Sequence, residues 1–148
     1  MNSNSIDILL VEDNMEDAEL TIMELKRHKL ANNLFHAIDG EQALDFIYST
    51  GEYLENRNTK HSFKLILLDI KMPKLNGIEV LKKIREDERT RMIPVVILTS
   101  SREDPDINTC YELGANSYIV KPVNFERFTE AIKKLGYYWL ALNQPPVV

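Results

Sequence analysis

Five polar residues that could do chemistry stand at the ends of short apolar runs: Glu12, Asp13, Asp69, Thr99 and Lys121. Their side chains supply three carboxylates, a hydroxyl and an ammonium group. Carboxylates about 4 Å apart repel one another by roughly 1 kcal/mol per pair in water and by more inside a protein, so a cluster of them stays ionised only beside a cation. An oxygen-rich cluster with access to water suits Mg²⁺, and no group of histidines and cysteines argues for zinc.

Such a group of side chains favours phosphoryl chemistry. An aspartate whose charge is neutralised by a metal ion can attack a phosphoryl donor and form an aspartyl phosphate. Mg²⁺ and Lys121 would then stabilise the negative charge on the phosphoryl oxygens. The carboxylates therefore predict a magnesium-dependent phosphoacceptor.

Each residue also has an ordinary structural explanation. Asp13 could cap a helix, and Asp69 could belong to a turn together with Met72-Pro73 and Gly77. Thr99 could be a hydroxyl at a strand end, and Lys121 could be a solvated lysine. These explanations would have to hold together at four separate strand ends, which makes a shared site the better interpretation.

Alternating strands and helices must position these residues. Five short apolar runs are expected to form strands: Ile8–Val11, Leu34–Ile38, Leu65–Leu68, Val95–Leu98 and Tyr118–Val120. Four of them are nearly continuous, as expected of parallel strands that are covered on both faces. Helical patterns alternate with the runs, which predicts a (βα)5 chain with a parallel sheet, right-handed crossovers and helices on both faces. In such a sheet, ligands bind beyond the carboxyl ends of the strands.

The helix patterns are specific enough to test. Apolar residues repeat at helical spacing in three segments: Met15, Ala18, Ile22 and Leu25; Ala43, Leu44 and Ile47; and Leu81 and Ile84. A fourth helix is expected to have Asp104 as its N-cap, Pro105 at its first position and Gly114 at its end. The last helix is expected to begin near Asn124.

Composition narrows the class of protein. The chain has 148 residues and a formal net charge of −5, which favours one domain and argues weakly against nucleic-acid binding. Its single cysteine, Cys110, is expected to be a small apolar residue in a reducing compartment. The sequence shows no signal peptide and no apolar run long enough to span a membrane, so we expect a soluble, cytoplasmic protein that binds neither nucleic acid nor membrane.

Four motifs in order resemble the receiver domain of two-component response regulators: Leu9-Leu10-Val11-Glu12-Asp13; Leu68-Asp69-Ile70-Lys71-Met72-Pro73 with Gly77; Ile97-Leu98-Thr99-Ser100; and Gly114 to Pro122, GANSYIVKP. The resemblance covers about residues 6–135, and the separations between Asp69, Thr99 and Lys121 also match the family. It implies an α/β, flavodoxin-like (βα)5 doubly wound parallel sheet with strand order 2-1-3-4-5. The whole chain, residues 1–148, is then expected to be a single receiver domain.

The resemblance implies a phosphoacceptor and a metal site. Asp69 would take a phosphoryl group from a phosphohistidine on a sensor histidine kinase or a phosphotransfer protein. Glu12, Asp13, Asp69 and the backbone carbonyl of Lys71 would hold Mg²⁺. As a signalling domain, the protein would catalyse only its own phosphorylation and dephosphorylation.

The resemblance also implies a switch. Thr99 would move to hydrogen-bond the phosphoryl group, Lys121 would pair with it, and the aromatic ring of Tyr118 would turn inward when Thr99 moves. The bond between Lys121 and Pro122 is implied to be cis.

Two departures from a minimal receiver carry information. Asp69 follows Asp13 by 56 residues, about a dozen more than in minimal receivers, and the surplus is an insertion at 49–62. This insertion and the late Trp139-Leu140 are similar to stand-alone receivers that work with phytochrome-type or related hybrid kinases. Lys71 stands two residues after Asp69, and we expect its charge to alter the lifetime of the phosphoryl group.

The end of the chain suggests how the signal leaves. After the last receiver helix near Leu135, a helical extension at 136–148 is too short for a DNA-binding domain, so output is expected through protein contacts or phosphorelay. A helical stripe continues past that point and predicts a homodimer or partner surface: Phe128, Leu135, Tyr138, Trp139 and Leu142. The alternative is that this stripe folds back on its own domain.

Two other functions compete with this one. A phosphatase of the haloacid-dehalogenase type also forms an aspartyl phosphate, but it requires a second aspartate at the position of Lys71. A degenerate receiver would act as a phosphorylation-independent binding module, although all five site residues are present here.

Overall fold

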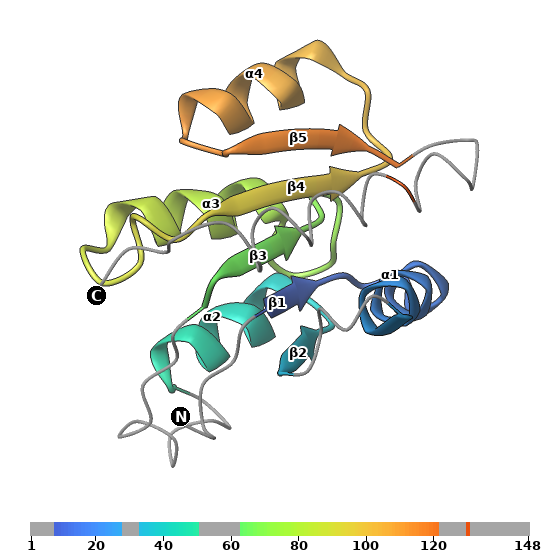
Figure 1. Ribbon diagram of the computed structural model, residues 1–148. Coiled ribbons are helices and arrows are strands. Elements are labelled where there is room, and N and C mark those ends of the chain that lie inside the picture. The colour runs from blue at the N-terminus through green and yellow to red at the C-terminus, as the bar shows by residue number, and fades with distance from the viewer. Residues whose placement is uncertain (1–7, 28–32, 51–62, 122–129, 131–148) are drawn as a thin grey trace.

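The computed structural model describes residues 8–27, 33–50, 63–121 and 130 (Figure 1). Within these ranges strands and helices alternate. The strands are β1 (Ile8–Val11), β2 (Leu34–Ala37), β3 (Leu65–Leu68), β4 (Val95–Thr99) and β5 (Ser117–Val120). The helices are α1 (Met15–Arg27), α2 (Gly40–Tyr48), α3 (Gly77–Glu86) and α4 (Asp104–Glu112).

The strands form one parallel sheet in the order β2-β1-β3-β4-β5, which confirms the predicted topology. Val11 at the end of β1 is paired with Ala37 on one side and with Leu68 on the other. The carboxyl ends of these three strands therefore meet at one edge of the sheet. The predicted strand boundaries are correct to within one residue, and the main difference is that Thr99 belongs to β4.

Two apolar layers cover the two faces of the sheet. Alternate residues of β1, such as Leu9 and Val11, pack with buried residues of α2, α3 and α4. The other residues, such as Ile8 and Leu10, pack with Ala18 and Leu25 of α1. Because both faces are covered, β1, β3 and β4 are buried along their whole length, as their continuous apolar sequences require.

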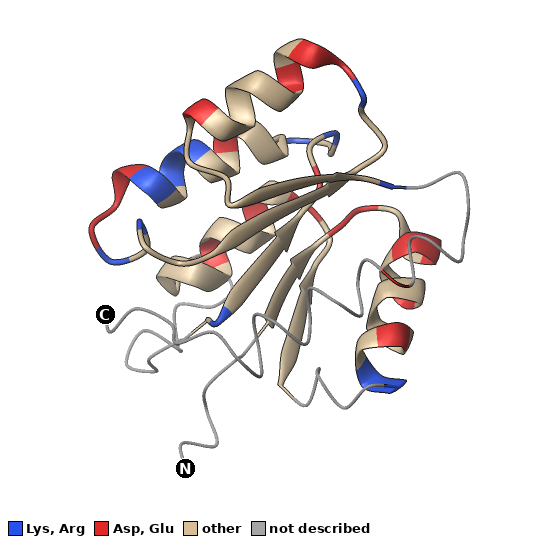
Figure 2. Cartoon of the chain, turned by 45° about the horizontal axis from the view of Figure 1, so that its top comes forward, with Lys and Arg blue, Asp and Glu red and all other residues tan. Residues whose placement is uncertain are grey.

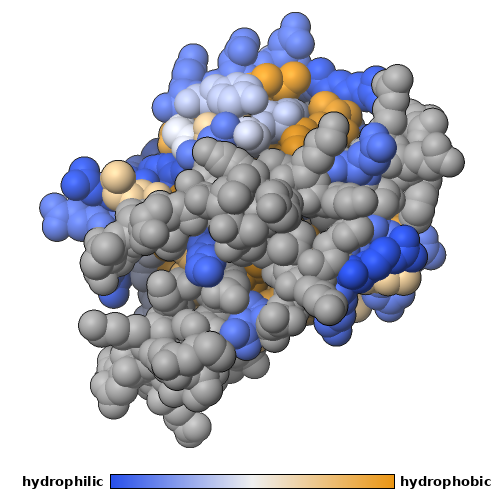
Figure 3. Space-filling model, in the orientation of Figure 1, coloured by the Kyte–Doolittle hydropathy of each residue, from blue (hydrophilic) through white to orange (hydrophobic). Residues whose placement is uncertain are grey.

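The sheet is less covered at its β5 edge. All four residues of β5 are half-buried, and in the view of Figure 3 hydrophobic side chains reach the surface over α4 and β5. No helix in the described ranges is long and apolar enough to span a membrane.

The buried face of α1 differs in part from the prediction. Ala18 and Leu25 are buried as expected, but Met15 is 54% exposed. Between Ala18 and Leu25, the buried residues of α1 are Thr21 and Glu24, two polar residues that an apolar pattern does not detect. Thr21 is accommodated because its hydroxyl donates to the carbonyl of Asp17, one turn earlier, at 2.9 Å.

The start of α4 also differs from the prediction by one residue. Glu103, not Asp104, is the N-cap, because its carbonyl accepts from the amides of Asp106 and Ile107. Asp104 is the first helical residue, followed by Pro105. The predicted end is correct: Gly114 has a left-handed backbone with φ of +99° and lies just past the C-cap, Leu113.

Several predictions concern residues outside the described ranges. These are most of the insertion at 49–62, of which only Ser49 and Thr50 are described, the state of the Lys121–Pro122 bond and the extension at 136–148. The predicted dimer residues Phe128, Leu135, Tyr138, Trp139 and Leu142 also lie outside. Of the predicted last helix, the structure describes Glu130 alone, which is helical and exposed.

Candidate phosphoacceptor and metal site

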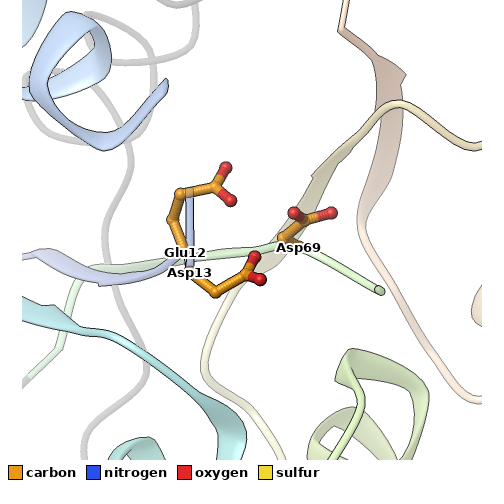
Figure 4. Close-up of side chains that lie close together, drawn as sticks. All are labelled: Glu12, Asp13 and Asp69. Atoms are coloured by element: carbon orange, nitrogen blue, oxygen red, sulfur yellow. The ribbon is translucent and has the colours of Figure 1, made fainter. Parts of the chain in front are cut away.

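Three carboxylates gather where β1 and β3 end side by side. Glu12 and Asp13 follow β1 and Asp69 follows β3, and one oxygen from each lies within 4.8 Å of the other two. Figure 4 shows the three side chains facing a common space. Backbone hydrogen bonds fix this arrangement, since Asp69 N donates to Val11 O and Glu12 N donates to Ala37 O, each at 3.0 Å.

A lysine from the far end of the sequence completes the cluster. Lys121 Nζ donates to Glu12, to Asp17 Oδ2 at 2.9 Å and to Asp69 Oδ2 at 3.4 Å. Only 13% of the Lys121 side chain is exposed. Figure 2 shows the basic segment at the end of β5 on the same side of the molecule as the acidic segments that follow β1 and line α1. The rim therefore collects opposite charges from β1, β3, β5 and α1.

Burial and crowding change the acidity of the groups in this cluster. Burial, followed by the hydrogen bond and the charge of Asp69, raises the pKa of Glu12 to about 8 despite the opposing effect of Lys121. Burial alone would lower the pKa of Lys121, but its hydrogen bonds to Glu12 and Asp17 and the charges of Glu12 and Asp69 outweigh it and raise that pKa. The cluster thus gathers several carboxyl groups around one ammonium group.

The helix-cap explanation of Asp13 is wrong, because another residue caps α1. The side chain of Asn14 accepts from Asp17 N at 3.0 Å, and its carbonyl accepts from Ala18 N at 2.9 Å. Asp13 itself is exposed and stands at the mouth of the cluster. Its carboxylate is therefore available to a ligand.

Thr99 and Tyr118 are connected through the loop after β4. Thr99 is fully buried, and its hydroxyl accepts from Ser101 N at 3.3 Å. The hydroxyl of Tyr118, on the half-buried strand β5, donates to Ser101 O at 2.9 Å. Ser101 Oγ in turn donates to Asp106 Oδ2 of α4 at 2.6 Å. A displacement of Thr99 would therefore act on both β5 and α4.

Lys71 forms an ion pair with the N-cap residue of α4. Its ammonium group is 3.9 Å from Glu103 Oε1, and both side chains are largely exposed. The side chain thus spans from the loop after Asp69 to the start of α4.

Three residues that contact this cluster or the loop after β4 were not predicted from the sequence: Asp17, His36 and Ser101. Asp17 stands one helical turn after Asp13, but Glu16 and Glu19 beside it are also acidic, so spacing alone does not single it out. His36 Nε2 lies 2.7 Å from Glu12 O and donates to it. This hydrogen bond satisfies the carbonyl of Glu12 one residue past the end of β1.

The donor set fits a hard divalent cation. Three carboxylates, one of them exposed, offer oxygen ligands, and this is the group of candidate metal ligands found among the described residues. Oxygen donors with open access suit Mg²⁺ or Mn²⁺. Lys121 partly neutralises the same carboxylates and lies next to Asp69.

A doubly wound parallel sheet with carboxylates, a buried threonine and a lysine at its carboxyl edge defines a signalling domain of the receiver class. Residues 8–133 match the model of the response regulator receiver domain. The chain therefore belongs to the receiver domain family of two-component response regulators. It is a signalling domain, and members of this class bind Mg²⁺ or Mn²⁺ at an acidic site like this one.

Two curated proteins resemble it over most of their length. The probable methanogenesis regulatory protein FilR2 of Methanothrix harundinacea is 37% identical over 94% of this chain and 86% of its own. Response regulator Rcp1 of Synechocystis sp. is 37% identical over 90% of this chain and 88% of its own.

Solved structures of response regulators share this fold. The Mn²⁺-bound form of Rcp1 superimposes with a TM-score of 0.86 at 34% identity, covering 96% of this chain and 99% of that one. The phosphorylated cyanobacterial phytochrome response regulator RcpA gives the same TM-score and identity, covering 97% and 99%.

Proposed function

We propose that Asp69 accepts a phosphoryl group from a phosphohistidine on a sensor histidine kinase or a phosphotransfer protein. The observation that carries the proposal is the place of Asp69: its carboxylate lies beside those of Glu12 and Asp13 and 3.4 Å from Lys121 Nζ. A carboxylate so placed can act as a nucleophile toward a phosphoryl donor whose charge is neutralised.

In this reaction an oxygen of Asp69 forms a bond to phosphorus as the bond from phosphorus to the donor imidazole breaks. The electron pair of that bond remains on the imidazole nitrogen, which takes up a proton. Lys121 stabilises the negative charge on the phosphoryl oxygens. The products are an aspartyl phosphate and a free histidine, and hydrolysis of the aspartyl phosphate returns the carboxylate. The domain catalyses no other reaction.

Glu12, Asp13, Asp69 and the backbone carbonyl of Lys71 would hold Mg²⁺. When bound, the ion neutralises the carboxylates and polarises the phosphoryl group. The three clustered carboxylates and the Mn²⁺-bound form of the similar Rcp1 support this assignment.

Thr99 and Tyr118 would carry the change to the surface. A phosphoryl group adds about −1.5 to −2 of charge, and Thr99 would leave Ser101 to hydrogen-bond it. Tyr118, which donates to the carbonyl of Ser101, would then turn inward. To move a 1:99 mixture of two conformations to 99:1, the phosphoryl group must favour one of them by about 5.5 kcal/mol.

The partner would be a histidine kinase of the phytochrome type. The similarity to RcpA, a phytochrome response regulator, and the predicted insertion at 49–62 support this choice.

We also propose a cytoplasmic domain with its core at about 6–135. Output would occur through protein contacts or phosphorelay and through a homodimer formed by the last helix. A monomer in sedimentation at high micromolar concentration, phosphorylated or not, would exclude the dimer.

Two alternatives have specific observations against them. The haloacid-dehalogenase mechanism requires a second aspartate, and the side chain of Lys71 at that position pairs with Glu103 instead. A degenerate receiver would lack part of the site, whereas Glu12, Asp69 and Lys121 all meet here.

Incubation of the purified chain with acetyl phosphate and Mg²⁺ tests the proposal. We expect a mass increase of one phosphoryl group that Asp69→Asn abolishes. Asp104→Asn, which removes an exposed carboxylate of α4, should leave it intact. Phosphorylation that persists in Asp69→Asn would refute the assignment of Asp69, and rapid hydrolysis of phosphomonoesters would indicate a phosphatase.

A further inference from the structure

The ammonium group of Lys121 has a carboxylate partner that belongs to neither the metal cluster nor the phosphoacceptor. Asp17 Oδ2 lies 2.9 Å from Lys121 Nζ, closer than Asp69 Oδ2 at 3.4 Å. We propose that Asp17 is a positioning residue for phosphoryl transfer, which holds Lys121 on the α1 side of the cluster and competes for it with the phosphoryl group on Asp69. This proposal rests on the proposed function.

The backbone of Asp17 is fixed at the start of α1. Asp17 N donates to the side chain of Asn14 at 3.0 Å, and Asp17 O accepts from the hydroxyl of Thr21 at 2.9 Å. The side chain of Asp17 is 39% exposed, whereas that of Lys121 is 13% exposed. The lysine is therefore enclosed by carboxylates, and Asp17 forms the solvent side of that enclosure.

Asp17 acts on the lysine and not on the cation. The carboxylates that could share one ion are Glu12, Asp13 and Asp69, and Asp17 is outside this group. A cation bound to Glu12 would partly neutralise that carboxylate. The attraction between Glu12 and Lys121 would then be weaker. Asp17 lies outside the group that could share the ion, so its attraction for Lys121 is not weakened in this way. In the metal-loaded protein, the main competitor of the phosphoryl oxygens for Lys121 is thus Asp17.

Removal of this competitor should speed phosphorylation. In Asp17→Asn, Lys121 is free to move from the α1 side to the phosphoryl oxygens. A partly exposed ion pair of this kind is worth a modest free energy, which corresponds to a rate increase of about 1.5- to fivefold. Asp17→Glu keeps the charge on a longer side chain and should stay near the wild-type rate.

The experiment measures the rate of phosphorylation of the full chain by acetyl phosphate at saturating Mg²⁺. Glu16→Gln is the matched control, because Glu16 is an exposed neighbour on the same helix and loses the same charge. We expect Asp17→Asn to be faster than both the wild type and Glu16→Gln. Asp17→Asn and Glu16→Gln are then compared again in a Lys121→Met background, which tests whether the effect of Asp17 passes through Lys121. Without the ammonium group, Asp17→Asn should have no effect beyond that of Glu16→Gln.

Two results would overturn the proposal. In the first, Asp17→Asn is no faster than Glu16→Gln, or is slower than the wild type, although the wild-type chain is phosphorylated on Asp69. In the second, the acceleration persists in the Lys121→Met background, which would make it a general effect of charge. Failure of the wild-type chain to be phosphorylated at all would refute the proposed function and this inference together. If Asp17→Asn does not fold, Asp17→Ser in the same cycle gives the same comparison.

Discussion

Gly77 packs directly on the backbone of Asp69: a Cβ atom at Gly77 would lie 1.9 Å from the carbonyl oxygen of Asp69. Gly77 is the first residue of α3, and its amide donates to Ile70 O at 2.7 Å. Because no side chain intervenes, the start of α3 closes the loop that follows β3. The side chain of Asp69 is held by a separate hydrogen bond, which Ile70 N donates to its Oδ1 at 2.8 Å.

Replacement of Gly77 by alanine should disturb this loop more than it disturbs the helix. The new methyl group meets backbone atoms, which cannot rotate away, so the loop must shift. We expect the free energy of unfolding to fall by about 1–3 kcal/mol. We also expect phosphorylation by acetyl phosphate to slow by roughly tenfold or more, since a small displacement of a reacting group is costly. Urea denaturation and mass spectrometry measure the two effects.

Glu79→Ala is the control for this substitution, because Glu79 is exposed on the same helix. It should change the phosphorylation rate little. An alanine variant of Gly77 that is phosphorylated at the wild-type rate would show that the contact does not position Asp69.

Asp13→Asn should weaken metal binding and stabilise the metal-free protein. Its carboxylate is exposed and lies in a group of three with oxygens within 4.8 Å of one another. Loss of one charge removes a ligand for the cation but also relieves repulsion from Glu12 and Asp69. We expect the Kd for Mg²⁺ to rise by about tenfold or more. We also expect the free energy of unfolding without metal to rise by about 0.5–1 kcal/mol.

Calorimetric titration with Mg²⁺ and urea denaturation in a chelator measure these opposite effects. Glu16→Gln removes a charge from α1 outside the cluster and should change neither by much. Equal Mg²⁺ affinity in Asp13→Asn and the wild type would exclude Asp13 as a ligand.

Arg85 should stabilise the fold through three hydrogen bonds from its guanidinium group. Its guanidinium donates to Ile93 O at 2.8 Å, to Gly114 O at 3.0 Å and to Asn116 Oδ1 at 3.1 Å. It thus ties α3 to the segments that precede β4 and β5. Hydrogen bonds from a charged donor are worth about 1.5–3 kcal/mol, so Arg85→Ala should lower the free energy of unfolding by roughly 2–4 kcal/mol.

Arg85→Lys should restore little of this loss, because an ammonium group does not reproduce the planar fork of donors. Lys82→Ala on the exposed side of the same helix should stay within about 0.5 kcal/mol of the wild type in urea denaturation. A loss in Lys82→Ala as large as that in Arg85→Ala would mean that removal of any long basic side chain from α3, and not loss of the Arg85 hydrogen bonds, lowers the free energy of unfolding.

Cys110 should be unreactive in the folded protein. It is fully buried, and burial followed by the charge of Asp106 raises the pKa of its thiol from 9.0 to about 11. The reactive form is the thiolate, so a higher pKa means less reactive thiol at a given pH: about a hundredfold less well below both values. We expect negligible reaction with Ellman's reagent at pH 8 and full reaction in guanidinium chloride. Rapid reaction of the native protein at pH 8 would contradict the burial of this residue.

Much of the fold could be predicted because burial on both faces leaves a local trace. Leu65–Leu68 was predicted and found as a strand with the same bounds, since a central parallel strand needs an unbroken apolar run. The position of Asp69 follows from that strand, because a carboxylate directly after a central strand must stand at the rim where ligands bind. The alternation of strands and helices and the position of the acidic residues at the strand ends could thus be predicted from short stretches of consecutive residues.

The tertiary structure alone decided which distant groups meet. Asp17 and Lys121 are 104 residues apart, and no local pattern distinguishes Asp17 from the acidic residues beside it. Burial of Thr21 and Glu24 in place of Met15 likewise depends on what lies against α1. The physical reason is the same in both cases. A periodic pattern records the average polarity of a face, whereas a hydrogen bond or ion pair depends on a partner from another element at about 3 Å.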